Sequence, residues 1–330
     1  MTQGLILATF LTCHFGKWRE RWHGVSNQSR SGASLLAPVP EENEGLLAAF
    51  DANTGQCIWK VTLDTPAGLA ITNDRIWVAS MHGNRLLCFD EKLDIIDVLS
   101  TPLMNDLHSL VISSGGRLMV TSSGVDAVLE VDDGGRLVWD WLATEKGYAY
   151  TPDNLRRSID RRADYRHLFI DTSVQATHCN CALPTVHDGR ETVLVSLFHQ
   201  GKIVAVDRLN GHHKCVLGGL GNPHSIRRRP NGYILCDSRP GNVVLVDENF
   251  WIMSIIEHDF SWVQDATELR PGRVLIADAN HSRLIEWDIK AGEPRSELRY
   301  PEEWKIYQME IIHGQWEQRI ASKADTVRDA

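Results

Sequence analysis

Short apolar segments alternate with turn-forming residues along most of the chain, and the stretch Gly221–Trp251 shows this pattern most clearly. Glycine, proline and asparagine pairs such as Asn231-Gly232 and Pro240-Gly241 favour tight reversals, because these residues adopt turn conformations at little cost. Four strands are predicted between such turns, at His224–Arg228, Tyr233–Asp237, Asn242–Asp247 and Trp251–Glu257. The segment is therefore predicted to form an antiparallel four-stranded meander.

An aspartate that follows an apolar residue marks the end of the third strand in each copy of this pattern. The six marks are Asp51, Asp90, Asp132, Asp207, Asp247 and Asp288, with spacings of 39, 42, 75, 40 and 41 residues. A period near 40 residues with four strands per unit is typical of a β-propeller, in which each unit forms one blade. The long interval holds one blade and about 33 additional residues. We therefore predict an all-β fold, a six-bladed propeller of four-stranded antiparallel blades.

The repeat predicts that residues 1–330 form a single propeller domain. The apolar segment Gly4–Phe15 is predicted to supply the second strand of blade 1, and Ile306–Ile312 its innermost strand. Strands from both ends of the sequence would then share blade 1 and close the ring, which removes the open sheet edges that a propeller cannot leave unpaired.

Three segments fall outside the repeat. Residues 16–45 are expected to form a long loop, residues 144–176 an insertion between blades 3 and 4, and residues 314–330 a polar tail. Within the insertion, a short helix is expected over Pro152–Ala163, because Thr151 is a favourable cap and a proline suits the first turn.

Composition narrows the class of partner. The net charge of −9 argues against a general nucleic-acid binder, which needs a basic face. No apolar run reaches the roughly 18–20 residues of a membrane helix. The seven cysteines are odd in number and lack the spacing of a disulfide framework, so a reducing cytoplasm is the expected location. A small-molecule substrate is the expected partner.

The first strand of each blade lines the central channel of a propeller, and its early residues face the mouth. Aligning the repeats places a polar residue there in five of the six blades: His108, Asn180 with His178 two residues earlier, His224, Gln264 and Gln308. Strand alternation puts His178 and Asn180 on one face. The predicted mouth is therefore polar and rich in imidazoles.

Two interpretations of this ring remain open. The polar groups can bond one another and channel water. Alternatively, His108, His178 and His224 can bind Zn²⁺ or another divalent ion and leave a position open for water or substrate, with Gln264, Asp265 or Asn180 around them. The insertion must pass near this mouth, where Tyr165 and Arg166 could reach a ligand. An anionic substrate group would suit Arg166 or Arg162.

The repeats resemble those of NHL-type β-propellers, most closely in Asn222–Asp247 and Gln264–Asp288, where an apolar-Asp pair ends the third strand. One enzyme family of this superfamily, the peptidyl-hydroxyglycine lyases, is similar in a more specific way. The resemblance implies a catalytic zinc held by histidines of Pro-His-x-Ile elements, which Pro223–Ile226 matches and Leu107–Leu110 matches without the proline. The Thr177–Asn180 element also resembles the propeller arylsulfotransferases.

We therefore expect a small-molecule enzyme, a lyase, hydrolase or group transferase, with its site at the channel mouth. The expected catalytic residues are His178, Arg166, Tyr165 and Asp265, and the expected ligand-binding residues are Asn180, Gln264 and Gln308. The alternative is a non-catalytic propeller that binds a ligand or a protein on the same face.

Overall fold

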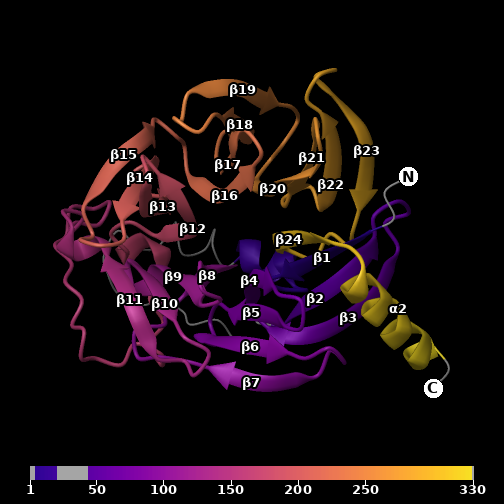
Figure 1. Ribbon diagram of the computed structural model, residues 1–330, viewed down its shortest axis with the longest axis horizontal. Coiled ribbons are helices and arrows are strands. Elements are labelled where there is room, and N and C mark those ends of the chain that lie inside the picture. The colour runs from indigo at the N-terminus through magenta and orange to yellow at the C-terminus, as the bar shows by residue number, and fades with distance from the viewer. Residues whose placement is uncertain (1–3, 21–43, 329–330) are drawn as a thin grey trace.

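The protein is a ring of six four-stranded sheets around a central axis (Figure 1). The computed structural model describes residues 4–20 and 44–328. Each sheet is antiparallel, and in five of them the strands follow one another in sequence order from the axis outward. The prediction of an all-β, six-bladed propeller is confirmed.

The blades are numbered from the sheet that contains β1. Blade 1 holds β24 (Ile306–Ile312), β1 (Leu5–Phe10), β2 (Glu44–Asp51) and β3 (Cys57–Asp64); blade 2 holds β4 (Pro66–Ile71), β5 (Ile76–Ser80), β6 (Arg85–Phe89) and β7 (Ile95–Leu99); blade 3 holds β8 (Leu107–Ile112), β9 (Leu118–Ser122), β10 (Ala127–Val131) and β11 (Leu137–Leu142). Blade 4 holds β12 (Cys179–His187), β13 (Arg190–Leu197), β14 (Lys202–Asp207) and β15 (His213–Gly218); blade 5 holds β16 (Pro223–Arg229), β17 (Gly232–Asp237), β18 (Asn242–Val246) and β19 (Ile252–Glu257); blade 6 holds β20 (Val263–Arg270), β21 (Arg273–Asp278), β22 (Arg283–Asp288) and β23 (Glu293–Arg299).

Blade 1 is built from both ends of the sequence, as predicted. The strand β24 pairs antiparallel with β1, with Leu5 opposite Ile312 and Ile6 opposite Ile311, and β1 pairs in turn with β2. Figure 1 shows the yellow β24 lying beside the indigo β1. The ring is therefore closed by main-chain hydrogen bonds within one sheet rather than by side-chain contacts alone.

The repeated aspartates mark the turns between the third and fourth strands because their carboxylates accept main-chain N–H groups there. Asp90 accepts from Lys92 and Asp94, and Asp247 accepts from Asn249 and Trp251, each at 2.8–3.0 Å. Such bonds hold a short turn in place without help from the rest of the fold. The period of about 40 residues in the sequence therefore reflects these recurring turns, each stabilised by its own aspartate.

The hydrophobic core lies between neighbouring blades rather than inside any one of them. One cluster joins Leu86 of blade 2 to Val120 of blade 3, and another joins Leu194 of blade 4 to Tyr233 of blade 5. Since each sheet buries its faces only against its neighbours, no blade is expected to be stable alone.

Two sequence-based expectations outside the repeat are wrong. The expected tail is instead the helix α2 (Gln315–Arg328), whose Trp316 and Ile320 pack into the core cluster shared by blades 1 and 2. The expected helix over Pro152–Ala163 is absent from the described structure of that segment, which runs through turns and an isolated bridge between Tyr150 and Arg156. Its backbone is held by tertiary bonds instead of a helical ladder.

Other segments complete the fold. Short 3₁₀ turns lie at η2 (Ser123–Val125), η3 (Ala143–Glu145) and η4 (Thr172–Val174), and residues 15–20 are helical. The greater part of the expected 16–45 loop lies outside the described residues.

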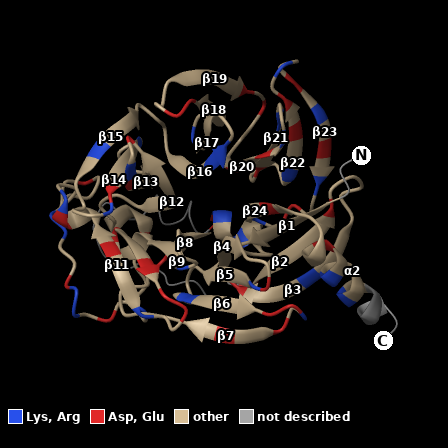
Figure 2. Cartoon of the chain, viewed as in Figure 1, with Lys and Arg blue, Asp and Glu red and all other residues tan. Residues whose placement is uncertain are grey.

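Charged residues of both signs are interleaved on the outer strands. Figure 2 shows Lys and Arg alternating with Asp and Glu along β23, where Glu293 pairs with Arg295 and Glu297 with Arg299. None of the helices in the described part of the chain is both long and apolar enough to cross a lipid bilayer.

Candidate functional site

Two of the predicted mouth residues, His108 and His178, come together at the end of the channel where the inner strands begin. His108 lies at the start of β8 and His178 immediately before β12, and their rings meet edge to face with centroids 4.5 Å apart. Both side chains are buried, with 5% and 4% of their surface exposed. Two imidazoles from blades 3 and 4 therefore share one small volume, as expected.

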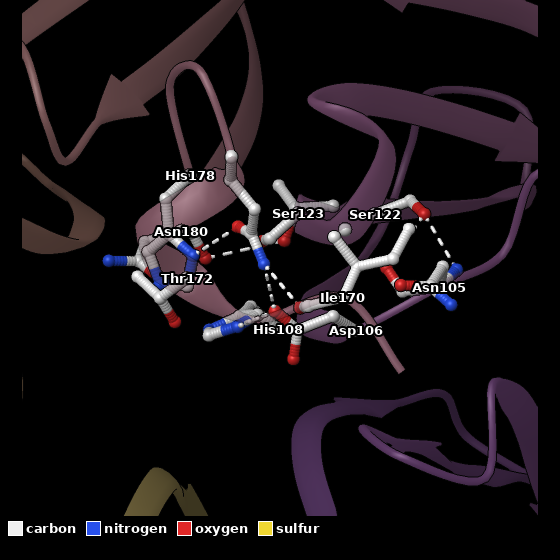
Figure 3. Close-up of polar contacts among 12 residues, drawn as sticks. Asn105, Asp106, His108, Ser122, Ser123, Ile170, Thr172, His178 and Asn180 are labelled. Carbon is white, nitrogen blue, oxygen red and sulfur yellow. Dashed lines mark hydrogen bonds and ion pairs between the residues drawn. The ribbon is translucent and has the colours of Figure 1, made fainter. Parts of the chain in front are cut away.

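A carboxylate joins these two imidazoles. Asp106, His108 and His178 each offer one ligand atom, and these atoms all lie within 4.8 Å of one another. Figure 3 shows the three side chains converging from neighbouring elements. Ligands held at 2.0–2.2 Å by a tetrahedral ion are about 3.3–3.6 Å apart, and Asp106 Oδ2 already lies 3.4 Å from His108 Nε2. A shift of about 1 Å in His178 would complete such a geometry.

The tautomer of His178 is set by Gln175. The amide Oε1 of Gln175 can only accept, and it lies 2.6 Å from His178 Nδ1, so Nδ1 carries the proton and Nε2 keeps its lone pair. The Nε2 of the same amide donates to Asp106 Oδ2 at 2.8 Å. Such outer partners orient the ligands of metal sites. One glutamine thus positions two of the three groups.

On the other imidazole, His108 Nδ1 is hydrogen-bonded to the hydroxyl of Tyr307, which reaches across from β24. This leaves His108 Nε2 facing Asp106. The atom is buried and makes no hydrogen bond to any described residue, because the contact with Asp106 is too long and poorly aligned. A buried ring nitrogen without a hydrogen-bond partner beside a carboxylate fits a divalent cation.

The pKa values of Asp106 and His178 both lie below their usual values. Burial by itself would raise the pKa of Asp106, but the neighbouring imidazoles His108 and His178 favour the carboxylate and hold its pKa well below the usual value. For His178, burial and then the nearby His108 lower its pKa well below the usual value. An ionised carboxylate and a neutral imidazole are the forms that bind metals.

The backbone around the cluster is constrained. Asp106 and His178 both have positive φ, 52° and 49°, which non-glycine residues rarely adopt and which often accompanies functional sites. On the other side of β8, Gly68 lies so close that a Cβ there would be 2.8 Å from the carbonyl oxygen of His108. The inner strand of blade 2 can approach β8 only with glycine at this position.

The third predicted imidazole, His224, lies outside this cluster. The ring of Phe198 stands between it and His178, at centroid distances of 5.1 and 5.0 Å. His224 Nδ1 contacts the hydroxyl of Ser238 at 2.8 Å, and burial lowers the pKa of His224 to about 3. The structure therefore brings His108 and His178 together but not His224, and the third group beside the two imidazoles is Asp106.

The predicted ligand-binding residues line a different part of the channel. Asn180, Gln264 and Gln308 border a cavity of about 280 Å³ whose lining consists of inner-strand residues from all six blades. Asp265 also borders it and forms an ion pair with Arg227, with Nη2 to Oδ2 at 2.7 Å. These four residues lie together, but none of them belongs to the Asp106–His108–His178 cluster.

The insertion forms a roof over the opposite side of the cluster. Its segment 165–170 is held by its main-chain carbonyls: Asn84 donates to that of Arg166 at 2.8 Å, and Asn105 to those of Tyr165 and Leu168 at 2.7 Å. Gln175 donates to the carbonyl of Ile170 at 3.1 Å (Figure 3).

A second cavity of about 240 Å³ lies between this roof and blades 2 and 3. It is lined by His82, Asn84, Asn105, Asp106, Arg166, His167, Leu168, Phe169 and Ile170. Asp106 is thus the member of the cluster that borders this outer cavity.

The two predicted insertion residues differ in placement. Arg166 borders the outer cavity, but its guanidinium pairs with Asp164, with Nη2 to Oδ2 at 2.6 Å. The hydroxyl of Tyr165 instead accepts from the main-chain N–H of Asp160 at 2.9 Å, and its ring packs against the core of blades 2 and 3. Their catalytic roles stay predictions, as does that of Asp265.

Three contributors were not predicted. Asp106 stands only two residues before His108, so the Asp-x-His pattern was an available signal, although Asp106 itself lies just before β8. Gln175 and Tyr307 gave no such signal, because each acts on a histidine that is distant in the chain or outside a regular strand.

Solved structures share the fold at low identity. A protein of unknown function from Bacteroides caccae has a TM-score of 0.63 at 14% identity and covers 95% of this chain and 100% of its own. A chain of a nidogen/laminin complex has a TM-score of 0.59 at 9% identity, covering 94% and 98%. A catalytically inactive virginiamycin B lyase from Staphylococcus aureus with quinupristin has a TM-score of 0.50 at 12% identity, covering 78% and 74%.

These likenesses establish the fold alone, and no curated protein sequence matches the chain. A family model does match, over residues 43–215, which is just over half of the sequence and runs from β2 of blade 1 into β15 of blade 4. The match supports a propeller superfamily, whereas the NHL-type subdivision stays a prediction. By this match the chain belongs to the propeller family described as outer membrane protein assembly factor BamB.

Proposed function

We propose that the protein is a metal-dependent enzyme that acts on a small molecule bound in the outer cavity. The observation that carries the proposal is the buried cluster of Asp106, His108 and His178, whose ligand atoms lie within 4.8 Å of one another. Two imidazoles and one carboxylate leave coordination positions open, as catalytic rather than structural metal sites do.

Each residue has a defined part in this proposal. His178 Nε2, His108 Nε2 and Asp106 would hold a divalent ion such as Zn²⁺, which when bound would lower the pKa of a coordinated water or polarise a substrate carbonyl. Gln175 keeps His178 in the tautomer that presents its lone pair, and Tyr307 orients His108.

The outer cavity favours a small substrate with an acidic group. Its volume of about 240 Å³ accommodates roughly eight water molecules at ~30 Å³ each. Arg166, His82 and His167 border it, and a substrate anion could displace Asp164 from Arg166, since that ion pair is solvent-accessible. Hydrolysis, elimination or group transfer would all suit this arrangement, and a propeller lyase shows that the fold is compatible with elimination.

We also propose a reducing compartment such as the cytoplasm. All seven cysteines are free thiols, and four of them are buried.

Metal analysis and turnover test the proposal together. Purified protein should hold about one divalent ion per chain, and a metal at 100 times its Kd should stabilise the fold by about 2.7 kcal/mol. Asp106→Ala and His178→Ala should each lose the ion, whereas His212→Ala, in an exposed hairpin turn of blade 4, should retain it. Turnover of a panel of small carboxylate-bearing esters and amides should stop on chelation.

Different outcomes exclude different parts of the proposal. Protein that holds no stoichiometric ion, with unfolding temperatures unaffected by chelators or added Zn²⁺ and Mn²⁺, would exclude the metal centre. A retained ion with no turnover of any panel member would favour the non-catalytic binding propeller.

A further inference from the structure

The channel cavity below the histidine layer is separate from the outer cavity and carries its own unsatisfied polar groups. Its lining comes entirely from β4, β8, β12, β16, β20 and β24, from His224 and Tyr307 at one end to Ile71, Ile112 and Leu183 at the other. Its volume of about 280 Å³ corresponds to roughly nine water molecules, or a ligand of about ten non-hydrogen atoms.

Asn180 supplies the decisive observation. Its side chain is 2% exposed, and its Oδ1 accepts no hydrogen bond from any described residue. Its Nδ2 has one long contact, 3.5 Å to the carbonyl of Pro223. Leaving a buried amide oxygen without a donor costs about 1–3 kcal/mol. The cavity therefore calls for an occupant with an N–H or O–H donor at this position.

The orientation of His224 adds a second acceptor. The hydroxyl of Ser238 donates to the carbonyl of Val263 at 2.5 Å, so its oxygen must accept from His224 Nδ1, 2.8 Å away. His224 Nδ1 therefore carries the proton, and Nε2 is a lone-pair acceptor. Among the described residues, Nε2 has no partner.

The two glutamines of the lining are also fixed. Gln308 Nε2 donates to the carbonyl of Leu69 at 2.6 Å and to Glu310 at 3.3 Å, which leaves its Oε1 as a further acceptor. Gln264 Oε1 accepts from the indole of Trp262 at 3.0 Å, so its Nε2 is the one free amide donor of this pair. The cavity is thus richer in acceptors than in donors.

The net charge of the side chains that line the cavity is also negative. One guanidinium, Arg227, faces two carboxylates, Asp265 and Glu310, so the formally charged side chains of the lining sum to −1. Arg227 is already committed to both carboxylates and to the carbonyl of Met309. The excess of acceptors and of negative charge favours a cation that carries several N–H donors.

We propose that the channel cavity is a second binding site, distinct from the metal cluster, for a small organic ammonium ion. The ammonium group donates to Asn180 Oδ1 and to a second acceptor of the lining, His224 Nε2 or Gln308 Oε1, and the carbon chain lies along the apolar inner-strand residues. Metal binding at Asp106 is not required for this site.

Calorimetry with three matched probes tests the proposal in amine-free phosphate buffer. Butylammonium should bind at least about tenfold more tightly than 1-butanol, because a hydrogen bond from a charged donor is stronger than one from a neutral hydroxyl. Butyrate, which offers acceptors only, should not bind. Equal affinity for the ammonium ion and the alcohol, or tighter binding of Na⁺ or Ca²⁺ than of butylammonium, would overturn the ligand class.

Two variants locate the site. Asn180→Leu, which keeps the side-chain shape, should weaken butylammonium binding by about tenfold, and Glu310→Gln, at a partly exposed carboxylate and therefore easier to tolerate, by several-fold. Gln318→Leu, on the exposed face of α2, should bind as the unaltered protein does. Unchanged affinity in a folded Asn180→Leu variant, or in Glu310→Gln if the first does not fold, would refute the assignment.

The Asp106→Ala variant keeps this test independent of the metal proposal. It should lose the metal and retain butylammonium binding. Loss of ammonium binding in Asp106→Ala would show that the two sites are one and would overturn this inference.

Discussion

Replacement of Arg227 with methionine tests how the last blades are held against the first. The guanidinium extends from β16 in blade 5 to Asp265 in blade 6, with two contacts of 3.1 and 2.7 Å. It also reaches blade 1, where it donates to the carbonyl of Met309 at 2.7 Å and bonds Glu310. One side chain therefore links three consecutive blades next to the strand that closes the ring.

The expected loss follows from burial. Asp265 is 1% exposed, and removal of its partner leaves an uncompensated charge in the channel wall. Breaking a buried ion pair from one side costs about 3–5 kcal/mol, because the remaining ion has lost water as well as its partner. Some relief is expected from channel water, so we expect Arg227→Met to lower the free energy of unfolding by about 3 kcal/mol.

Urea denaturation followed by tryptophan fluorescence measures this loss. Arg299→Met is the matched control, since Arg299 lies on the outer strand β23 and pairs with Glu297 in an exposed position. Exposed pairs contribute about 0–1 kcal/mol. Adding Asp265→Asn to Arg227→Met should recover about 1 kcal/mol or more, because it removes the buried charge.

The reasoning fails if Arg227→Met costs no more than the Arg299→Met control. It also fails if adding Asp265→Asn lowers the free energy of unfolding further instead of restoring part of it. The penalty in Arg227→Met would then not come from the unpaired charge of Asp265.

Three further predictions concern other buried groups. Burial lowers the pKa of Lys305 to about 7, so between pH 7 and about 10 the unfolded chain binds more protons than the folded one, and stability should rise with pH. From pH 7 to 9 the unaltered protein should gain about 2–3 kcal/mol of unfolding free energy relative to Lys305→Met in denaturation curves. Parallel pH profiles of the two proteins would contradict this. Burial alone would raise the pKa of Glu130, but its bonds to Arg208 and Ser113 lower it, so the stabilisation by the ionised carboxylate is present above about pH 4.5 and lost in acid. Glu130→Gln should therefore lower the free energy of unfolding by about 2 kcal/mol at pH 7 and by less at pH 3. A cost that does not depend on pH would be inconsistent with an ionised pair. Gly68→Ala should cost about 2 kcal/mol or more in thermal unfolding, since its Cβ would meet the backbone of β8 at 2.5–2.8 Å, and a neutral effect would show that β4 can move away.

The blade count was predictable because it rests on local chemistry. Each marking aspartate, such as Asp90 or Asp247, bonds main-chain groups two to four residues ahead, so the signal is complete within its own turn. Ring closure was predictable for a related reason, because β24 was a strand without a blade of its own.

The candidate site was predictable only in part. His108 and His224 occupy equivalent places in two repeats, and His178 stands two residues before the equivalent Asn180, so alignment found all three, but His224 is turned toward Ser238 instead. The helix α2 was missed because its sequence is largely polar, and only Trp316 and Ile320 reveal the buried face. The orientation of His224 and the docking of α2 depend on side-chain packing between segments that are distant in the sequence, and no local sequence pattern predicts such packing.

The way the insertion is fastened has a consequence for how this protein can change. Two asparagines of blades 2 and 3 and Gln175 of the insertion itself bond the carbonyl oxygens of Tyr165, Arg166, Leu168 and Ile170, and every amino acid supplies a carbonyl. The identities at Arg166, His167 and Phe169 can therefore vary while the loop keeps its shape. Substitutions at these positions can therefore change the shape and charge of the outer cavity without changing the path of the backbone around it.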